Sequence, residues 1–278
     1  MGTGNKEMHL LLISIANIHA GTCMKATFHA YALVAYLPIP KFHNISPAVQ
    51  AILSVHIFHH AVSLVMQNLK MACKNSKVMS DPNGHLHVIH TPLITWIADY
   101  PEQLLITCTS SRNSLISTAT AERFSDPTPA PPCFHQQTLD AIKQAYTACD
   151  PCDNIAAFYK VCLVLCLSGI VKSFWEDWGN ACPLQFLTPD MLHAWHKFFF
   201  DHCVHWIINI MGREELGHHL LVLQPYIGTR NWPDGISKLK QTRGRDHQEI
   251  KRLLAVVAAG AIPGNVLCAI CAITCRKL

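Results

Sequence analysis

The chain has 278 residues, of which 50% are hydrophobic and only 14% are charged, and its formal net charge is +4. This composition excludes a wholly disordered chain, and the length allows one large domain or two modest ones. The small net charge does not mark the whole chain as nucleic-acid binding. Lys and Arg are nevertheless concentrated between Lys238 and Arg252, which predicts a local basic patch.

The first apolar segments predict two strands. His9–Ile18 and Ala30–Leu37 are both apolar, with a polar connection between them. Leu10–Ile18 is also similar to a short signal peptide, but Glu7 and the weakly basic start favour the strand.

A helix, a turn and a third strand are expected next. Ala48–Cys73 has broad apolar faces at helical spacing, and Asp81-Pro82-Asn83-Gly84 has the composition of a turn. His87–Ile97 is apolar and β-branched, which predicts a buried strand that ends near Asp99. We expect this strand to lie in one sheet with the two before it.

The second half of the chain is predicted to be mainly helical. Arg112–Gln137 is rich in Ser, Thr and Pro and predicts a loop. Leu253–Cys275 is long enough to span a bilayer, but Pro263 and Gly264 interrupt it, which favours two short helices. The other expected helices are Leu139–Lys172, Pro189–Met211 and Gln248–Ala261.

Asp99 is the first candidate for chemistry. A rigid carboxylate at the end of a strand is a suitable ligand for a divalent metal ion. The same residue could instead accept backbone hydrogen bonds in a turn.

Asp190 and His193 are the second candidate. They lie three residues apart, beside His196, on a helix that Pro189 can begin. Hydrogen bonding between the two side chains explains the pattern as well as a metal site does. The single C-x-x-C at Cys149–Cys152 lacks the second pair of ligands that zinc requires, and the 13 cysteines indicate buried free thiols.

Several short blocks follow one another in a fixed order along the chain. They are Asn17-Ile18-His19, Tyr36–Lys41, Ala98–Gln103, Phe186–Lys197, Gly235–Gln241 and Gly244-Arg245-Asp246-His247. In this succession the chain resembles the Plavaka transposases, cut-and-paste elements of fungi that are similar to the CACTA and KDZ elements. The resemblance covers nearly the whole chain, and the ordered series is more specific than any single block.

The resemblance implies a ribonuclease H-like core in which three acids hold two Mg²⁺ or Mn²⁺ ions for phosphodiester cleavage. It places Asp99 at the second acid, as the expected metal ligand, and matches Asp190 and His193 to the family's D-x-x-H motif. The implied fold is α/β (α+β). It has a partial ribonuclease H-like core over residues 1–110, a linker over residues 111–137 and a helical insertion region over residues 138–278.

The chain departs from the family pattern at two acids. No Asp precedes the predicted strand at His9–Ile18, and the third acid would lie beyond Leu278. One carboxylate would hold two metal ions weakly, so we expect a truncated, catalytically inactive piece of a transposase that holds no metal.

The resemblance implies DNA and other transposase segments as partners, a location in the nucleus and no membrane partner. Phosphate contacts would supply the residual affinity for DNA. The residues expected to make them are Lys238, Lys240, Arg243, Arg245 and Arg252.

Two other functions remain open from the residues. An active metal-dependent nuclease or transposase would need further acids, such as Glu102 or Asp81. A membrane or secreted protein would depend on the apolar segments Leu10–Ile18 and Leu253–Cys275.

Overall fold

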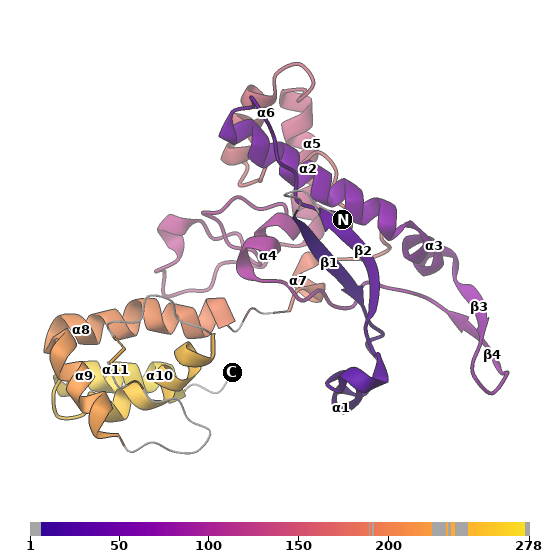
Figure 1. Ribbon diagram of the computed structural model, residues 1–278. Coiled ribbons are helices and arrows are strands. Elements are labelled where there is room, and N and C mark those ends of the chain that lie inside the picture. Colours follow the sequence, from indigo (N-terminus) through magenta and orange to yellow (C-terminus); the bar gives the residue numbers. More distant parts are fainter. Residues whose placement is uncertain are drawn as a thin grey trace. The chain divides into compact units, whose positions relative to one another are not determined.

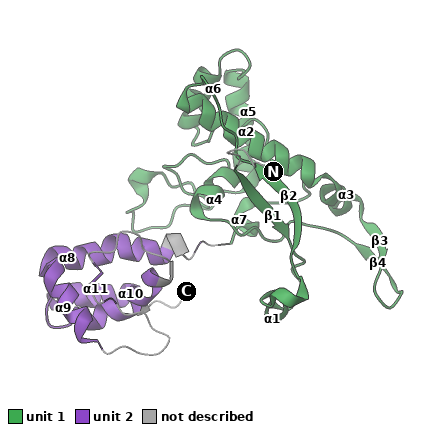
Figure 2. Ribbon diagram, in the orientation of Figure 1, with its two compact units in different colours: residues 1–188 green, residues 189–278 purple. Residues whose placement is uncertain are grey.

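The computed structural model describes residues 7–188, 190, 192–223, 232, 235–236 and 244–275, and it contains both helices and strands. The predicted α+β class is therefore confirmed. The chain divides into two compact units, Met1–Thr188 and Pro189–Leu278 (Figure 2). The boundaries expected at residues 110 and 137 stay a prediction.

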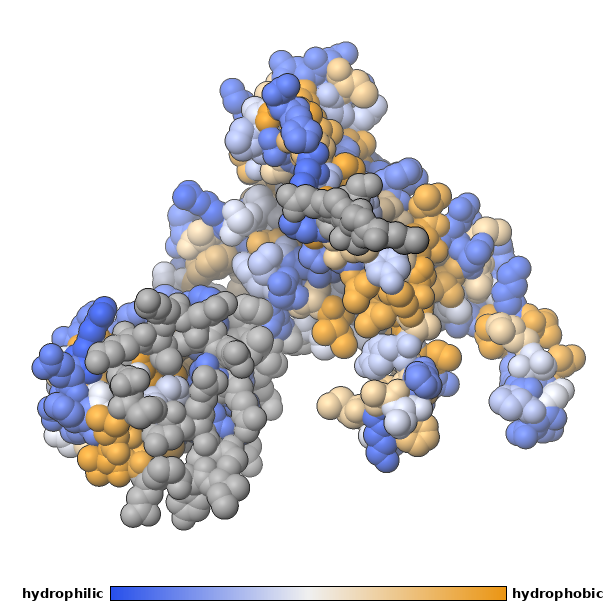
Figure 3. All heavy atoms as spheres, viewed as in Figure 1, coloured by the Kyte–Doolittle hydropathy of each residue, from blue (hydrophilic) through white to orange (hydrophobic). Residues whose placement is uncertain are grey.

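Two of the predicted strands pair with each other. β1 (Met8–Ile13) and β2 (Ala32–Pro38) are antiparallel, with an irregularity in register between Leu11 and Leu12. The short helices α1 (Ala20–Cys23) and η1 (Ala26–Phe28) lie between them in sequence (Figure 1). Leu11 and Leu37 are buried, but many apolar side chains of this hairpin are exposed, and Figure 3 shows hydrophobic residues gathered over it.

Helix α2 (Pro47–Val65) has proline in its first turn, where a backbone N–H would have no partner within the helix. It packs against β2 and α6 and buries Ile52, His59 and Val62. Among the described residues it alone is long and apolar enough to cross a membrane, by length and composition only. Within this helix His59 is buried and hydrogen-bonded to the carbonyl of Leu105.

Helix α3 (Gln67–Asn75) follows α2 directly and carries a buried cation. Lys70 Nζ lies 2.6 Å from Asp177 Oδ1 and 2.8 Å from Ser63 Oγ. These contacts fix α3 to α2 and to the segment before α7 (Pro183–Phe186).

The prediction of one sheet containing three strands is wrong. β3 (Lys77–Ser80) and β4 (Leu86–Ile89) form a separate antiparallel pair closed by the predicted turn at Asp81–Gly84. Asp81 Oδ1 accepts the backbone N–H groups of Asn83 and His85 at 2.8 and 2.9 Å, which stabilises this turn. Because the turn brings β3 alongside β4, the third strand pairs with its neighbour in sequence and ends at Ile89.

The remaining elements of the first unit are mostly helical. They are α4 (Tyr100–Ile106), η2 (Ala121–Arg123), α5 (His135–Ala148), α6 (Ile155–Val164) and α7. The helix predicted over Leu139–Lys172 is interrupted between α5 and α6, where Pro151 removes a donor and Asn154 caps α6 through the N–H of Ala157.

Indole N–H groups tie the core of the first unit together. Trp175 Nε1 donates to the carbonyl of Ile106 at 2.7 Å, and Trp178 Nε1 donates to the carbonyl of Thr91 at 3.0 Å. Phe158, Phe174 and Phe186 are fully buried beside them.

The second unit is helical. Two π-helical segments, η3 (Leu192–Lys197) and η4 (Phe200–Val204), precede α8 (His205–Met211), α9 (Arg213–Val222), α10 (Gly244–Val257) and α11 (Gly264–Cys275). The prediction of two short helices over Leu253–Cys275 is confirmed, because α10 ends at Val257 and α11 begins after Pro263.

Candidate functional site

Asp99 lies at the N-terminus of α4. Its backbone is extended, and its Oδ1 accepts the N–H of Glu102 at 3.0 Å, which makes it the N-cap of the helix. Pro101 occupies the first turn. Asp99 therefore has the second of its two predicted roles: it accepts a backbone hydrogen bond in a turn.

Two neighbours of Asp99 join α4 to the segment around Thr188. Gln103 is buried, and its Nε2 donates to the carbonyls of Ala98 and Thr188 at 3.0 and 2.7 Å. The N–H of Trp96 also donates to the carbonyl of Phe186 at 2.6 Å. Two blocks that are far apart in sequence, Ala98–Gln103 and the start of Phe186–Lys197, therefore meet here.

Glu102 is the acid next to Asp99 along the helix. Its Oε1 accepts the indole N–H of Trp96 at 3.2 Å. Burial raises the pKa of Glu102, and the charge of Asp99 raises it further, while the indole hydrogen bond opposes them. Glu102 is thus a partly buried carboxyl engaged with Trp96.

The described residues around Asp99 do not fit a two-metal site. Such a site needs several carboxylates that converge on each ion. Glu102 is bonded to Trp96, and Asp81 is bonded within the β3–β4 turn. Within the ranges that the structure describes, no group of three or more His, Cys, Asp or Glu side chains could hold a metal ion.

Replacing Asp99 with alanine is expected to lower the free energy of unfolding by about 1 kcal/mol, because the N–H of Glu102 loses its acceptor. Asp99→Ser should keep most of that stability, since a serine hydroxyl also caps helices. Urea denaturation of the three proteins measures the difference. Equal stability of the alanine and serine variants would contradict the capping role.

Asp190 and His193 belong to the second unit. Asp190 is half-buried and precedes η3. His193 lies within η3, but its side chain is outside the described residues. The expected interaction between the two side chains stays a prediction.

Most of the predicted DNA-contacting residues also lie outside the described residues. Lys238, Lys240 and Arg243 do so entirely, and Arg245 has only its backbone described, at the start of α10. Arg252 is exposed, with Nη1 3.8 Å from Glu249 Oε1 one turn earlier. Glu249 is buried, but the side chain of Arg252 is 64% exposed and the contact is long, so the guanidinium group is open to a phosphate.

A cation–π contact joins α10 to η3, although its residues are not among the predicted site residues. Lys251 Nζ lies 4.2 Å from the centroid of the Trp195 ring and 5.9 Å from that of Phe199. Burial lowers the pKa of Lys251. Burial also lowers the pKa of the nearby His196, and the positive charges of Lys251 and Arg252 add to this effect. Trp195 and Lys251 are too far apart in sequence for spacing to reveal the contact.

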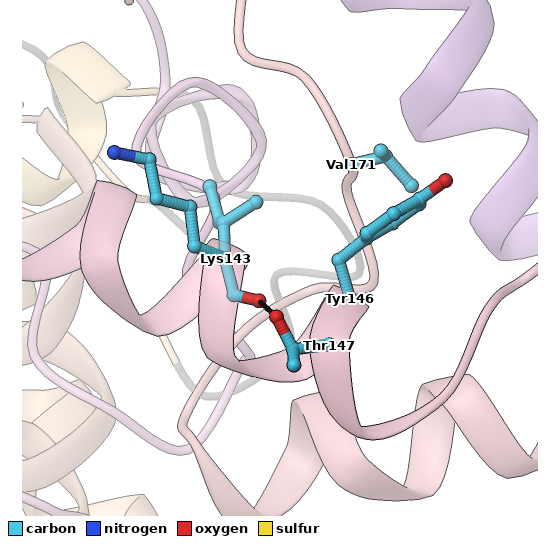
Figure 4. A pocket seen from close by; sticks show the side chains of 5 residues that line it. Lys143, Tyr146, Thr147 and Val171 are labelled. Carbon is cyan, nitrogen blue, oxygen red and sulfur yellow. Dashed lines mark hydrogen bonds between the residues drawn. The ribbon is translucent and has the colours of Figure 1, made fainter.

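A shallow hollow on α5 offers no catalytic groups. It is lined by Ile142, Lys143, Tyr146, Thr147 and Val171 (Figure 4). Thr147 Oγ1 donates to the carbonyl of Lys143 at 2.9 Å, which is a bond within the helix. No carboxylate or thiol lines this hollow, so we assign it no chemistry.

Comparison with known proteins identifies a family. A model of the Plavaka transposases, described as "Plavaka transposase", matches residues 1–207, which is more than half of the chain. No curated protein and no solved structure matches the chain. The match spans the β1–β2 hairpin, the capped helix at Asp99 and the π-helical segments of the second unit. The chain therefore belongs to the Plavaka transposase family.

Proposed function

We propose that this chain is a DNA-contacting part of a cut-and-paste transposase and does not cleave DNA by itself. The family match supports DNA as the partner, because a transposase acts on DNA ends. The basic stretch that ends at Arg252 supplies the phosphate-binding chemistry.

The geometry of Asp99 is the observation that supports the second half of the proposal. The carboxylate caps α4, and the neighbouring acid Glu102 is bonded to Trp96. Asp99 would stand at the second acid of a ribonuclease H-like core, as the family resemblance implies. Cleavage with Mg²⁺ or Mn²⁺ would then need carboxylates that the described part of this chain does not bring to Asp99. Nuclear localisation is part of the same proposal.

The affinity for duplex DNA is expected to fall steeply with salt, because phosphate contacts release counterions. Arg252→Ala should reduce the slope of log K against log salt by about 1 and weaken binding to all sequences alike. Fluorescence anisotropy of a labelled duplex over a salt series measures both effects.

Arg123→Ala is the matched control for this measurement. Arg123 is also an exposed arginine in an ion pair with an acid three residues away, Asp126, but it lies in the first unit. Its removal should leave the slope unchanged. A slope near zero for the native chain, or equal losses in the two variants, would contradict the proposal.

A further inference from the structure

Three aromatic side chains form a row on the second unit. The ring centroids of Phe198 and His202 are 4.5 Å apart, and those of His202 and Trp206 are 6.1 Å apart. Phe198 and Trp206 are each 49% exposed, and His202 is exposed as well. We call these three residues the ring ladder.

The ring ladder follows from the sequence spacing. Its residues recur every four positions, which places them in one row on a helix. The residue after each of them, Phe199, Cys203 and Ile207, belongs to a second row that is fully buried. The buried row holds the helix in the core, so folding does not require the exposed rings.

Two features indicate that the exposed row has a function. Exposed apolar side chains that are scattered are ordinary, whereas exposed rings in contact with one another form a contiguous patch of the kind that marks interaction sites. The ladder also begins beside one π-helical segment and runs through another, η3 and η4. Such segments occur frequently at functional sites.

The charges beside the ladder favour an anionic partner. Lys197 precedes Phe198 and is exposed, although it pairs with Asp201. Arg252 lies near His196, two residues before the ladder, and its exposed side chain makes a long contact to the buried Glu249.

We propose that the ring ladder stacks the bases of single-stranded DNA while Arg252 and Lys197 contact the phosphates. Unpaired bases present a ring face that stacks on aromatic side chains, whereas bases in a duplex are already stacked on one another. This inference rests on the proposed function, because it takes DNA as the partner, and it adds a preference for unpaired strands.

Binding of a labelled oligo(dT) of about 20 nucleotides tests the ladder, with the matching duplex measured in parallel. Trp206→Ala and Phe198→Ala should each weaken oligo(dT) binding at least about fivefold, the effect of losing one stacked base. Trp206→Phe should retain most of the affinity. Val222→Ala is the control, because Val222 is 81% exposed on α9 and is not part of the ladder.

Tryptophan fluorescence gives an independent readout. All six tryptophans lie in the described residues, and only Trp206 is exposed. Oligo(dT) should quench the emission of the native chain, and Trp206→Phe should abolish most of this quenching. The duplex should quench weakly.

Three results would overturn the ladder. The first is unchanged oligo(dT) affinity in both alanine variants, each shown to be folded by circular dichroism. The second is that Trp206→Ala leaves the affinity for oligo(dT) intact but dissociates an oligomer of the chain, as measured by sedimentation velocity. The row would then be a protein interface. In both cases, salt-dependent duplex binding would leave the proposed function standing. The third is that the chain binds neither oligo(dT) nor the duplex, which would overturn both the ring ladder and the proposed function.

Discussion

Replacing His59 with leucine is expected to lower the free energy of unfolding by about 3 kcal/mol. His59 is 1% exposed within α2 and bonds to two distant segments. Its Nδ1 accepts the backbone N–H of Phe174 at 3.1 Å, and its Nε2 donates to the carbonyl of Leu105 at 2.9 Å. In His59→Leu, the carbonyl of Leu105 would still accept a hydrogen bond from the N–H of Cys108. The buried N–H of Phe174, in contrast, would lose its acceptor.

His59→Asn is the matched variant. Asparagine has nearly the shape of leucine, and its amide oxygen can replace Nδ1 as the acceptor for Phe174. Its stability should fall between those of the native chain and of His59→Leu. Urea denaturation of all three proteins checks this order, and equal losses in the two variants would contradict the role of the hydrogen bond.

The same residue makes stability depend on pH. The pKa of His59 is lowered from 6.5 to about 4, mainly by burial; the bond to Leu105 opposes this shift, and the nearby His56 adds to it. Between pH 6.5 and 4 the unfolded chain therefore binds a proton that the folded chain does not. The contribution of His59 to the free energy of unfolding is fully present above pH 6.5. It falls by about 3 kcal/mol as the pH approaches 4. His59→Asn should lack this part of the pH dependence.

Removing Asp177 is expected to have the second largest effect. The side chain of Lys70 is only 7% exposed, and without Asp177 its ammonium group would keep Ser63 as a partner but no opposite charge. Because the side chain of Asp177 is 51% exposed, water can enter and limit the loss. Asp177→Ala should therefore lower the free energy of unfolding by about 2 kcal/mol, less than for a fully buried pair.

Lys70→Met separates the charge from the packing. Methionine keeps an apolar stem in the same place and leaves no buried cation, so this variant should lose less stability than Asp177→Ala. Adding Lys70→Met to Asp177→Ala should restore part of the loss. If the double variant is less stable than Asp177→Ala alone, the buried charge is not the cause.

Local signals in the sequence predict much of this fold. Proline at the start of α2, the Asp81–Gly84 turn and the break at Pro263 each act through their neighbours in sequence. The capping role of Asp99 could also be predicted, because Asp is a favoured N-cap residue and Pro101 follows in the first turn of the helix. The strands β1 and β2 follow from their apolar pattern.

Contacts between distant segments explain what the sequence could not predict. The pairing of β4 with β3 was missed because Lys77–Ser80 is too short to show a strand pattern. His59 depends on groups near Leu105 and Phe174, and Lys251 depends on Trp195, so neither role can be recognised from spacing. The regular spacing of Phe198, His202 and Trp206, in contrast, is visible in the sequence, but their exposure is not.

We propose that this member of the Plavaka family contacts DNA without cleaving it, with Asp99 acting as a helix cap. The most direct test incubates the purified chain with labelled duplex DNA and Mg²⁺ or Mn²⁺, beside the Asp99→Ser variant. Serine keeps the cap but removes the carboxylate, so both proteins should bind the duplex and neither should produce metal-dependent fragments. Metal-dependent cleavage by the native chain that disappears in Asp99→Ser would contradict the account and would make Asp99 a catalytic carboxylate.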